Sequence, residues 1–148
     1  MIDVRRLRPA DVEAMTALNR VFGQVFADAV YAAKPPSADY MRGLLAKDSF
    51  VALAAYGDGE LVGGLAGYEL PKFEQERSEF YIFDLAVRED RRRRGIATAL
   101  IDAFRSIAAQ NNGWVVFVQA DHGDRPAIAL YTKLGTREDV LHFDIDVG

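Results

Sequence analysis

The chain has 148 residues, half of them hydrophobic and 27% charged, with a formal net charge of −4. These values are typical of a single globular domain, so we expect one domain over residues 1–148. The absence of cysteine excludes disulfides, thiolate metal sites and a cysteine nucleophile, and it is compatible with the cytoplasm. No apolar run approaches the ~20 residues that span a bilayer, and an acidic chain is a poor partner for nucleic acid. We therefore expect neither a membrane nor a nucleic-acid partner.

The first third of the chain predicts one strand and two helices. Ile2, Val4 and Leu7 favour a first strand, which Arg8-Pro9 is expected to end. Asp11 is the expected N-cap of a helix that Gly23 either ends or only interrupts. Two prolines mark residues 26–36 as a loop whose shape the pattern leaves open. Ser37 is the expected N-cap of a second, short helix.

The middle of the chain predicts three strands. Residues 50–56 and 61–68 read as the arms of a hairpin joined by Gly57-Asp58-Gly59. Residues 78–87 are rich in β-branched and aromatic side chains, so we expect them to form the central strand. A polar connection separates this strand from the hairpin.

The last third alternates helices with strands. Apolar residues at helical spacing predict a helix from Gly95 to about residue 110, and residues 114–120 predict a strand. Pro126 suits the first turn of another helix, which Gly135 is expected to end. Residues 140–145 predict a final strand. The whole pattern predicts a mixed α/β fold with a twisted, mostly antiparallel sheet and helices on both faces.

The turn between the central strand and the helix after it carries the clearest chemical pattern. Free backbone N–H groups and the helix dipole favour an anion there, and the four arginines at residues 91–94 add positive charge. Gly95 lets a ligand approach the backbone closely. The glycine and lysine spacings of P-loops and dinucleotide folds are missing, and the pattern is Arg92-x-x-Gly95-x-Ala97. The alternative is a solvated basic turn that starts an ordinary helix.

This turn resembles the pyrophosphate-binding loop of the GCN5-related N-acetyltransferase superfamily, which holds acetyl-coenzyme A. The block Asp124-x-x-Ala127-x-x-Leu130-Tyr131-x-x-Leu134-Gly135 resembles the superfamily's later motif, in which a helix lies beside the pantetheine arm. The resemblance implies the superfamily's fold and acetyl-CoA as co-substrate. The residues that it assigns to the cofactor are Leu85, Ala86, Val87, Arg92, Arg93, Arg94, Gly95, Ile96, Ala97, Thr98, Asp124, Ala127 and Tyr131. No metal is expected, because two separated histidines and no cysteine make no recognisable site.

Further blocks resemble the aminoglycoside 3-N-acetyltransferase branch of this superfamily. They comprise residues 70–75, 77–79, 81–82, 84–87, 95–101, 118–121, 130–135 and 142–146. The resemblance implies acetyl transfer to the 3-amino group of the 2-deoxystreptamine ring, which inactivates the antibiotic, and it implies a homodimer. The rival functions are acetylation of a polyamine or a protein amine, and non-catalytic binding of acyl-CoA.

Asp84 is the first candidate for the base that binds the acceptor ammonium and takes its proton. Ideal alternation puts it on the same strand face as Phe80, Ile82 and Ala86, an apolar setting that raises the pKa of a carboxyl group. The alternative is a structural carboxylate paired with an arginine. Glu79 is the second candidate, and it lies on the opposite face unless a bulge intervenes.

The remaining expectations concern the leaving group and the acceptor. Tyr131 is the expected proton donor to the departing thiolate, because its hydroxyl has an ordinary pKa of ~10; the alternative is a core aromatic residue. Backbone N–H groups of residues 85–87 are expected to steady the acetyl oxygen during direct attack in a ternary complex. A polycationic substrate needs several acids, and Asp121 and Asp144 rank highest with Glu79 and Asp84.

Overall fold

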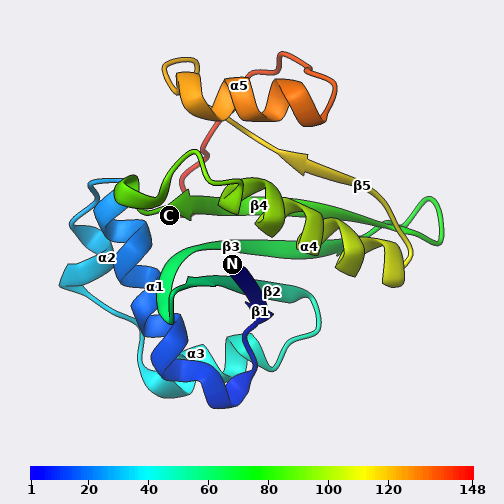
Figure 1. The fold of residues 1–148 in the computed structure, drawn as a ribbon. Helices are drawn as coiled ribbons and strands as arrows, with labels where there is room; N and C mark the ends of the chain where they lie inside the picture. Colours follow the sequence, from blue (N-terminus) through cyan, green and yellow to red (C-terminus); the bar gives the residue numbers. More distant parts are fainter. The chain divides into compact units, whose positions relative to one another are not determined.

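The structure is a computed structural model that describes the backbone of residues 1–148 and every side chain except that of Ala32. The chain divides into two compact units, Met1–Val118 and Gln119–Gly148. The first unit holds a five-stranded sheet with the spatial order β1-β2-β3-β4-β5 (Figure 1). Its strands are β1 (Ile2–Arg6), β2 (Phe50–Gly57), β3 (Glu60–Pro71), β4 (Ser78–Val87) and β5 (Gly113–Val118). Its helices are η1 (Pro9–Asp11), α1 (Val12–Val25), α2 (Val30–Ala33), α3 (Ala38–Leu45), η2 (Glu89–Arg91) and α4 (Ile96–Gln110).

The sheet is antiparallel from β1 to β4, and β5 is parallel to β4. The tight turn between β2 and β3 has Asp58 at φ 53° and Gly59 at φ 80°. Two successive positive φ angles match the right-handed twist of the flanking strands, as in the commonest two-residue hairpins. The predicted mixed, mostly antiparallel sheet and its hairpin are confirmed.

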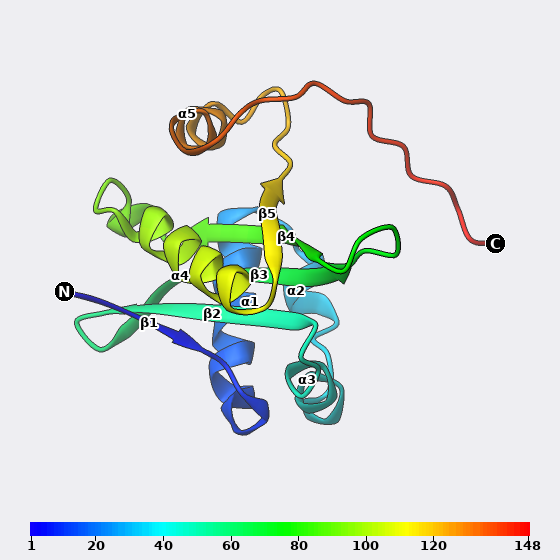
Figure 2. The same cartoon turned by 90° about the vertical axis from the view of Figure 1, so that its right-hand side faces the viewer.

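Helices cover both faces of the sheet, as predicted. Helix α4 contacts β3, β4 and β5, whereas α1 contacts β2, β3 and β4 from the opposite face (Figure 2). On the α4 face, Phe104 meets Phe80 edge-on with ring centroids 5.7 Å apart, and both side chains are buried. On the other face, Leu18 and Phe22 of α1 pack with Met41 of α3 against small strand residues. The sheet is therefore the middle layer between two apolar cores.

Local details of the N-terminal third follow the sequence in part. Ser37 caps α3 as predicted, because its hydroxyl oxygen accepts the Tyr40 N–H at 3.1 Å. Helix α1 continues through Gly23 to Val25, so this glycine interrupts nothing. The expected loop over residues 26–36 contains the four-residue helix α2.

Strand β4 contains a bulge at Phe83. Ile82 pairs with Gly67, but the next partner along β3, Ala66, pairs with Asp84. Adjacent residues of β3 point to opposite faces, so Ile82 and Asp84 do as well. The prediction that Asp84 shares a face with Phe80 and Ile82 is therefore wrong, because the extra residue reverses the alternation.

The C-terminal unit consists of α5 (Arg125–Leu134) and extended chain. Asp124 caps α5, since its side chain accepts the Ala127 N–H at 3.2 Å, and Gly135 ends the helix as predicted. The predicted strand over residues 140–145 is wrong. A strand forms only where its backbone pairs with a neighbour, and no described residue pairs with this segment, whose apolar side chains are exposed. No helix in the described part of the chain is long and apolar enough to cross a membrane.

Candidate active site

The second half of β4 has an open edge. Strand β5 pairs with β4 only from Ser78 to Ile82, so the two strands separate where the bulge begins. From Phe83 to Val87, no described strand pairs with β4 on the side away from β3. Backbone groups that point to this side are available to an extended ligand, in the way that a sheet edge accepts another strand.

The turn after β4 leads directly to the free N-terminus of α4. Gly95 precedes the helix at φ 76°, in the left-handed region that favours glycine, and no described side chain caps the first turn. The N–H groups of Ile96, Ala97 and Thr98 lie in that turn, where a helix leaves its donors unpaired. Arg93 also has a positive φ, 63°. This geometry fits the predicted anion-binding turn.

The arginine run is divided between structural and available side chains. Arg91 is largely enclosed, and its guanidinium lies 2.9 Å from a Glu60 carboxylate oxygen and 3.6 Å from one of Asp58. Arg92 donates from Nε to the Val87 carbonyl oxygen at 3.4 Å, which ties the turn to the end of β4. Arg93 and Arg94 are exposed. They are therefore the arginines best placed to reach a phosphate group from solvent.

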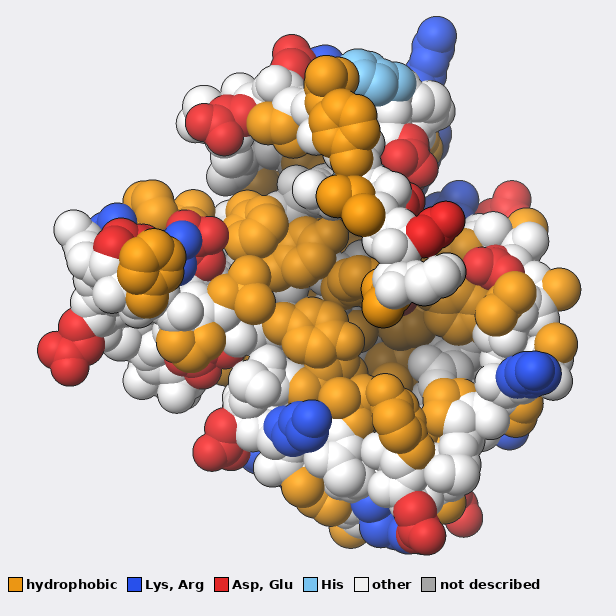
Figure 3. All heavy atoms as spheres, turned by 180° about the vertical axis from the view of Figure 1, so that it is seen from behind, with side chains coloured by type: hydrophobic (Ala, Val, Ile, Leu, Met, Phe, Trp, Pro, Cys, Tyr) orange, Lys and Arg blue, Asp and Glu red, His pale blue; other side chains and the backbone are white. Residues whose placement is uncertain are grey.

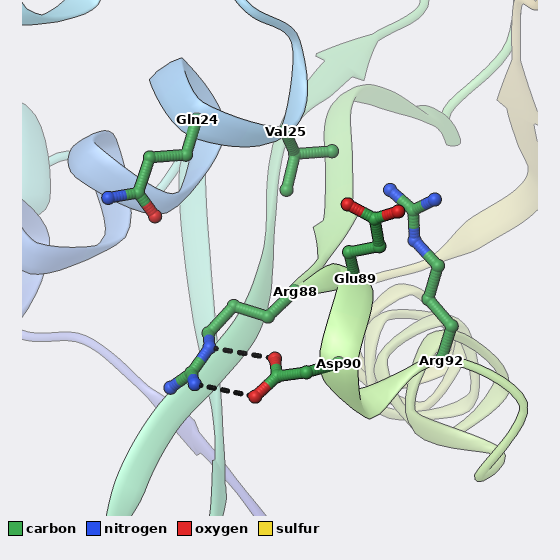
Figure 4. A pocket seen from close by; sticks show the side chains of 6 residues that line it. All are labelled: Gln24, Val25, Arg88, Glu89, Asp90 and Arg92. Atoms are coloured by element: carbon green, nitrogen blue, oxygen red, sulfur yellow. Dashed lines mark hydrogen bonds and ion pairs between the residues drawn. The ribbon is translucent and has the colours of Figure 1, made fainter.

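A cavity of about 310 Å³ lies between the end of α1 and this turn (Figure 4). Arg88 and Asp90 pair within it through two hydrogen bonds of 3.2 and 2.9 Å. The residues that line it are Gln24, Val25, Arg88, Glu89, Asp90 and Arg92. Gln24 and Val25 could not be predicted as lining residues, because no sequence motif links the end of α1 to the turn. The end of α1 therefore lines one side of a cavity whose other side is the predicted cofactor turn.

Asp84 lies half-buried on the face of the sheet that α1 and α2 cover. The Tyr31 hydroxyl donates a hydrogen bond to Asp84 Oδ2 at 2.9 Å. Burial raises the pKa of Asp84, and the Tyr31 hydrogen bond offsets part of that rise. The predicted direction of this pKa shift is confirmed, although the face is different. The hydrogen-bond partner is a tyrosine rather than the arginine of the alternative interpretation.

The bulge also brings the second candidate acid to the same face as the first. Glu79 pairs with Leu70 and Asp84 pairs with Ala66, and these two β3 residues lie on one face. Glu79 Oε2 lies 3.4 Å from Lys72 Nζ, which lies equally far from Glu74 Oε1. Glu79 is therefore already paired with an ammonium group, which it shares with Glu74, so Asp84 remains the stronger candidate for the base.

Aromatic rings surround the strand face that carries Asp84. Phe83 meets Tyr68 and Tyr81 edge-on, with centroids 6.1 and 5.9 Å apart, and 59% of its surface is exposed. Hydrophobic side chains gather on the side of the protein away from α4 (Figure 3). Such rings attract ammonium groups through their π faces. The sequence analysis predicted only acidic residues for the acceptor and did not include these rings. The aromatic run at residues 80–83 was the signal that could have indicated them.

Five predicted site residues belong to the C-terminal unit: Asp121, Asp124, Ala127, Tyr131 and Asp144. Asp124 caps α5. Asp144 Oδ1 lies within hydrogen-bond distance of His142 Nε2, at 2.9 Å. Burial raises the pKa of Tyr131 to about 12, with a further contribution from the charge of Asp124. The hydroxyl of Tyr131 is therefore protonated at neutral pH, as a proton donor must be. Asp121 is exposed, the Ala127 N–H is the donor that Asp124 accepts, and the functional roles of all five residues stay predictions.

Metal binding has no support in the side chains that the structure describes. Among them, no three His, Asp or Glu residues gather closely enough to hold an ion.

The comparisons with known proteins described here all find acetyltransferases. A model of the acetyltransferase (GNAT) family matches residues 14–136. An N-alpha-acetyltransferase from Sulfurisphaera tokodaii is 32% identical over 96 residues, which cover 57% of this chain and 58% of that protein. The crystal structure of an aminoglycoside acetyltransferase from an uncultured soil metagenomic sample is 54% identical, with a TM-score of 0.98 over 100% of this chain and 99% of that one. A second soil aminoglycoside acetyltransferase, solved with sisomicin, is 30% identical with a TM-score of 0.93, covering 99% of this chain and 97% of that one.

Proposed function

Because the chain belongs to the acetyltransferase (GNAT) family, which uses acetyl-CoA, we propose that this N-acetyltransferase acetylates an amine of an aminoglycoside. The observation that carries the proposal is Asp84, a half-buried carboxylate with a raised pKa beside the open edge of β4. A base of this kind is needed because the acceptor arrives as an ammonium ion. The substrate class is supported by the likeness to the two soil enzymes over nearly the whole chain.

The proposed cofactor site follows the open edge and the turn. Backbone groups of Leu85, Ala86 and Val87 pair with the pantetheine arm, and the first turn of α4 binds the diphosphate. Arg93 and Arg94 add charge from solvent, while Arg92 holds the turn against Val87. The proposal also assigns Asp124, Ala127 and Tyr131 of the C-terminal unit to the cofactor.

The proposed reaction is direct attack in a ternary complex. Asp84 takes a proton from the acceptor ammonium, and the freed amine forms a bond to the acetyl carbon. Backbone N–H groups of residues 85–87 stabilise the oxyanion. The carbon–sulfur bond then breaks, and Tyr131 protonates the coenzyme A thiolate. The acylated nitrogen loses its second proton to solvent, and solvent returns a proton to Tyr131. The absence of cysteine removes the commonest covalent route.

The finer parts of the proposal extend beyond the family. We propose the 3-amino group of the 2-deoxystreptamine ring as the acceptor, antibiotic inactivation as the role and the cytoplasm as the location. Glu79, Asp121 and Asp144 are the proposed acids for the other ammonium groups. We also propose a homodimer, which the exposed apolar side chains of residues 140–147 support.

A thiol-release assay with acetyl-CoA tests the function directly. The panel comprises sisomicin, gentamicin, spermidine and a peptide with a free N-terminal amine, the last because of the likeness to an N-alpha-acetyltransferase. We expect thiol release with the aminoglycosides, and NMR of the product to show acetylation at the 3-amino group. A preference for spermidine or the peptide would replace the proposed substrate. Acetyl-CoA binding without thiol release from any amine would favour the acyl-CoA-binding alternative.

The division of the arginine run gives a contrasting prediction. Arg93→Ala and Arg94→Ala are each expected to weaken coenzyme A binding by roughly 3- to 10-fold, less at high salt, because an exposed charge near a phosphate is removed. Arg91→Ala is expected to lower the free energy of unfolding by about 1 kcal/mol instead, because it breaks contacts with Glu60 and Asp58. Isothermal titration and denaturant unfolding measure the two effects. Equal losses of affinity in all three variants would contradict this division.

A further inference from the structure

We infer that Tyr31 is the positioning residue for Asp84, holding the carboxylate so that its second oxygen faces the acceptor amine. The inference rests on the proposed role of Asp84 as the base. The Tyr31 hydroxyl and Asp84 Oδ2 are 2.9 Å apart, although 53 residues separate them along the chain. No motif of the sequence marks Tyr31, which lies on the four-residue helix α2 outside the sheet.

A close contact with α1 holds Tyr31 in position. A Cβ atom added at Gly23 would lie 2.9 Å from Tyr31 Cβ, closer than such atoms come in folded proteins. The Tyr31 ring also contacts Phe22 and Phe26, with centroids 6.4 and 6.1 Å away. A glycine inside a helix costs about 1 kcal/mol relative to alanine. The reason for this glycine is therefore the space that its missing side chain leaves for Tyr31.

The turn before α2 fixes the same tyrosine from the other end. The Asp28 N–H donates to the Gly23 carbonyl oxygen at 3.0 Å, and Asp28 Oδ1 accepts the Val30 N–H at 3.0 Å. The Tyr31 N–H donates to the Asp28 carbonyl oxygen at 3.3 Å. These bonds hold α2 against α1, so the hydroxyl reaches Asp84 from a fixed position.

The hydrogen bond has a defined electrostatic effect. It is donated to the charged form of Asp84, so it favours the carboxylate that acts as a base. The titratable groups that face Asp84 are Tyr31 from α2, Tyr68 from β3 and Tyr81 from β4, and Asp28 faces Tyr31. Burial and the bond to Asp84 raise the pKa of Tyr31 to about 12, so its hydroxyl remains a donor throughout the neutral range.

The first test is the pH profile of kcat/KM for Tyr31→Phe. Without the hydroxyl, the pKa of Asp84 is expected to rise further, because a hydrogen bond to its charged form is lost. The acid limb of the profile then moves to higher pH. We expect kcat/KM to fall by roughly 10-fold below the limb, the size expected when one hydrogen bond to a charged group is lost, and to fall little above it. Tyr56→Phe is the matched control, since it removes a hydroxyl from β2 beside Arg5. An equal loss at every pH would overturn the inference.

A second readout is independent of acetyl transfer. Carbon-13 NMR of labelled aspartate carboxyl groups follows the titration of Asp84 directly, with the resonance assigned by its absence in Asp84→Asn. We expect the Asp84 titration to move to higher pH in Tyr31→Phe without cofactor or acceptor. An unchanged titration would overturn the inference even in an active enzyme. Absence of acetyl transfer by the wild type would instead overturn the proposed function and leave this measurement valid.

The contact between Tyr31 and Gly23 can be tested by a substitution that leaves the Tyr31 hydroxyl in place. Gly23→Ala is expected to push Tyr31 away from α1 and to shift the acid limb in the same direction as Tyr31→Phe. Gly43→Ala is the matched control, because Gly43 also lies in a helix and an added Cβ there meets nothing within 4 Å. We expect the Gly43 variant to keep the wild-type profile. A wild-type profile for Gly23→Ala as well would show that this contact does not position the tyrosine.

Discussion

Replacing Asp84 with asparagine should lower turnover at least ~100-fold while the affinity for acetyl-CoA stays nearly intact. Asparagine keeps the shape of the side chain and an oxygen for the Tyr31 hydroxyl, but it takes no proton from an ammonium ion. The acceptor then stays protonated and does not attack the thioester. Single-turnover rates measure the loss, and isothermal titration measures the affinity for acetyl-CoA.

Glu79→Gln is the comparison that separates the two candidate acids. Both residues lie on the same face of β4, but Glu79 is already paired with Lys72. We expect its replacement to raise the KM of the acceptor by a few-fold. The ~100-fold loss of turnover is expected only in Asp84→Asn. Near-normal turnover in Asp84→Asn together with a large loss in Glu79→Gln would move the role of base to Glu79.

Phe104→Ala should produce the largest loss of stability, about 3–5 kcal/mol. The ring is fully buried and meets Phe80 edge-on, so its removal leaves a cavity between α4 and the sheet. For a chain of this length, the midpoint of thermal unfolding should fall by roughly 10–15 °C. Denaturant unfolding and calorimetry measure the two quantities.

Phe73→Ala is the matched control for that loss. It deletes the same side chain from the connection between β3 and β4, where 99% of the ring surface is exposed. We expect its effect on unfolding to stay within about 0.5 kcal/mol. Similar effects of the two substitutions would mean that Phe104 does not support the core in the way the structure describes.

Much of the first unit could be predicted from its sequence because the patterns there are local. Strand β4 begins and ends as predicted, since its β-branched and aromatic run is bounded by polar residues on both sides. The left-handed Gly95 and the first turn of α4 also follow from a short pattern of arginine and glycine. Ser37 caps its helix through a bond that spans three residues. Such features depend on neighbours in the chain and need no knowledge of the fold.

The features that were predicted wrongly or missed depend instead on residues far apart in the chain. The face of Asp84 depends on how β4 registers against β3, and the pattern of one strand does not contain the bulge that sets it. The contact with Tyr31 joins residues 53 positions apart. The expected strand over residues 140–145 has suitable alternation, but a strand exists only with a partner. Local patterns therefore indicate Asp84 as a candidate base, but its surroundings could be described only from the folded chain.

The bulge at Phe83 has a consequence for how related enzymes diverge. Loss of this one codon would leave Ile82 opposite Gly67 and Asp84 opposite Ala66, now in regular alternation. Asp84, the proposed base, would keep its place, while the exposed ring of Phe83 beside it would disappear. We expect a single deletion at this point to alter which amines are accepted and to spare the chemical step. Length variation here is thus a short evolutionary route to a new substrate range.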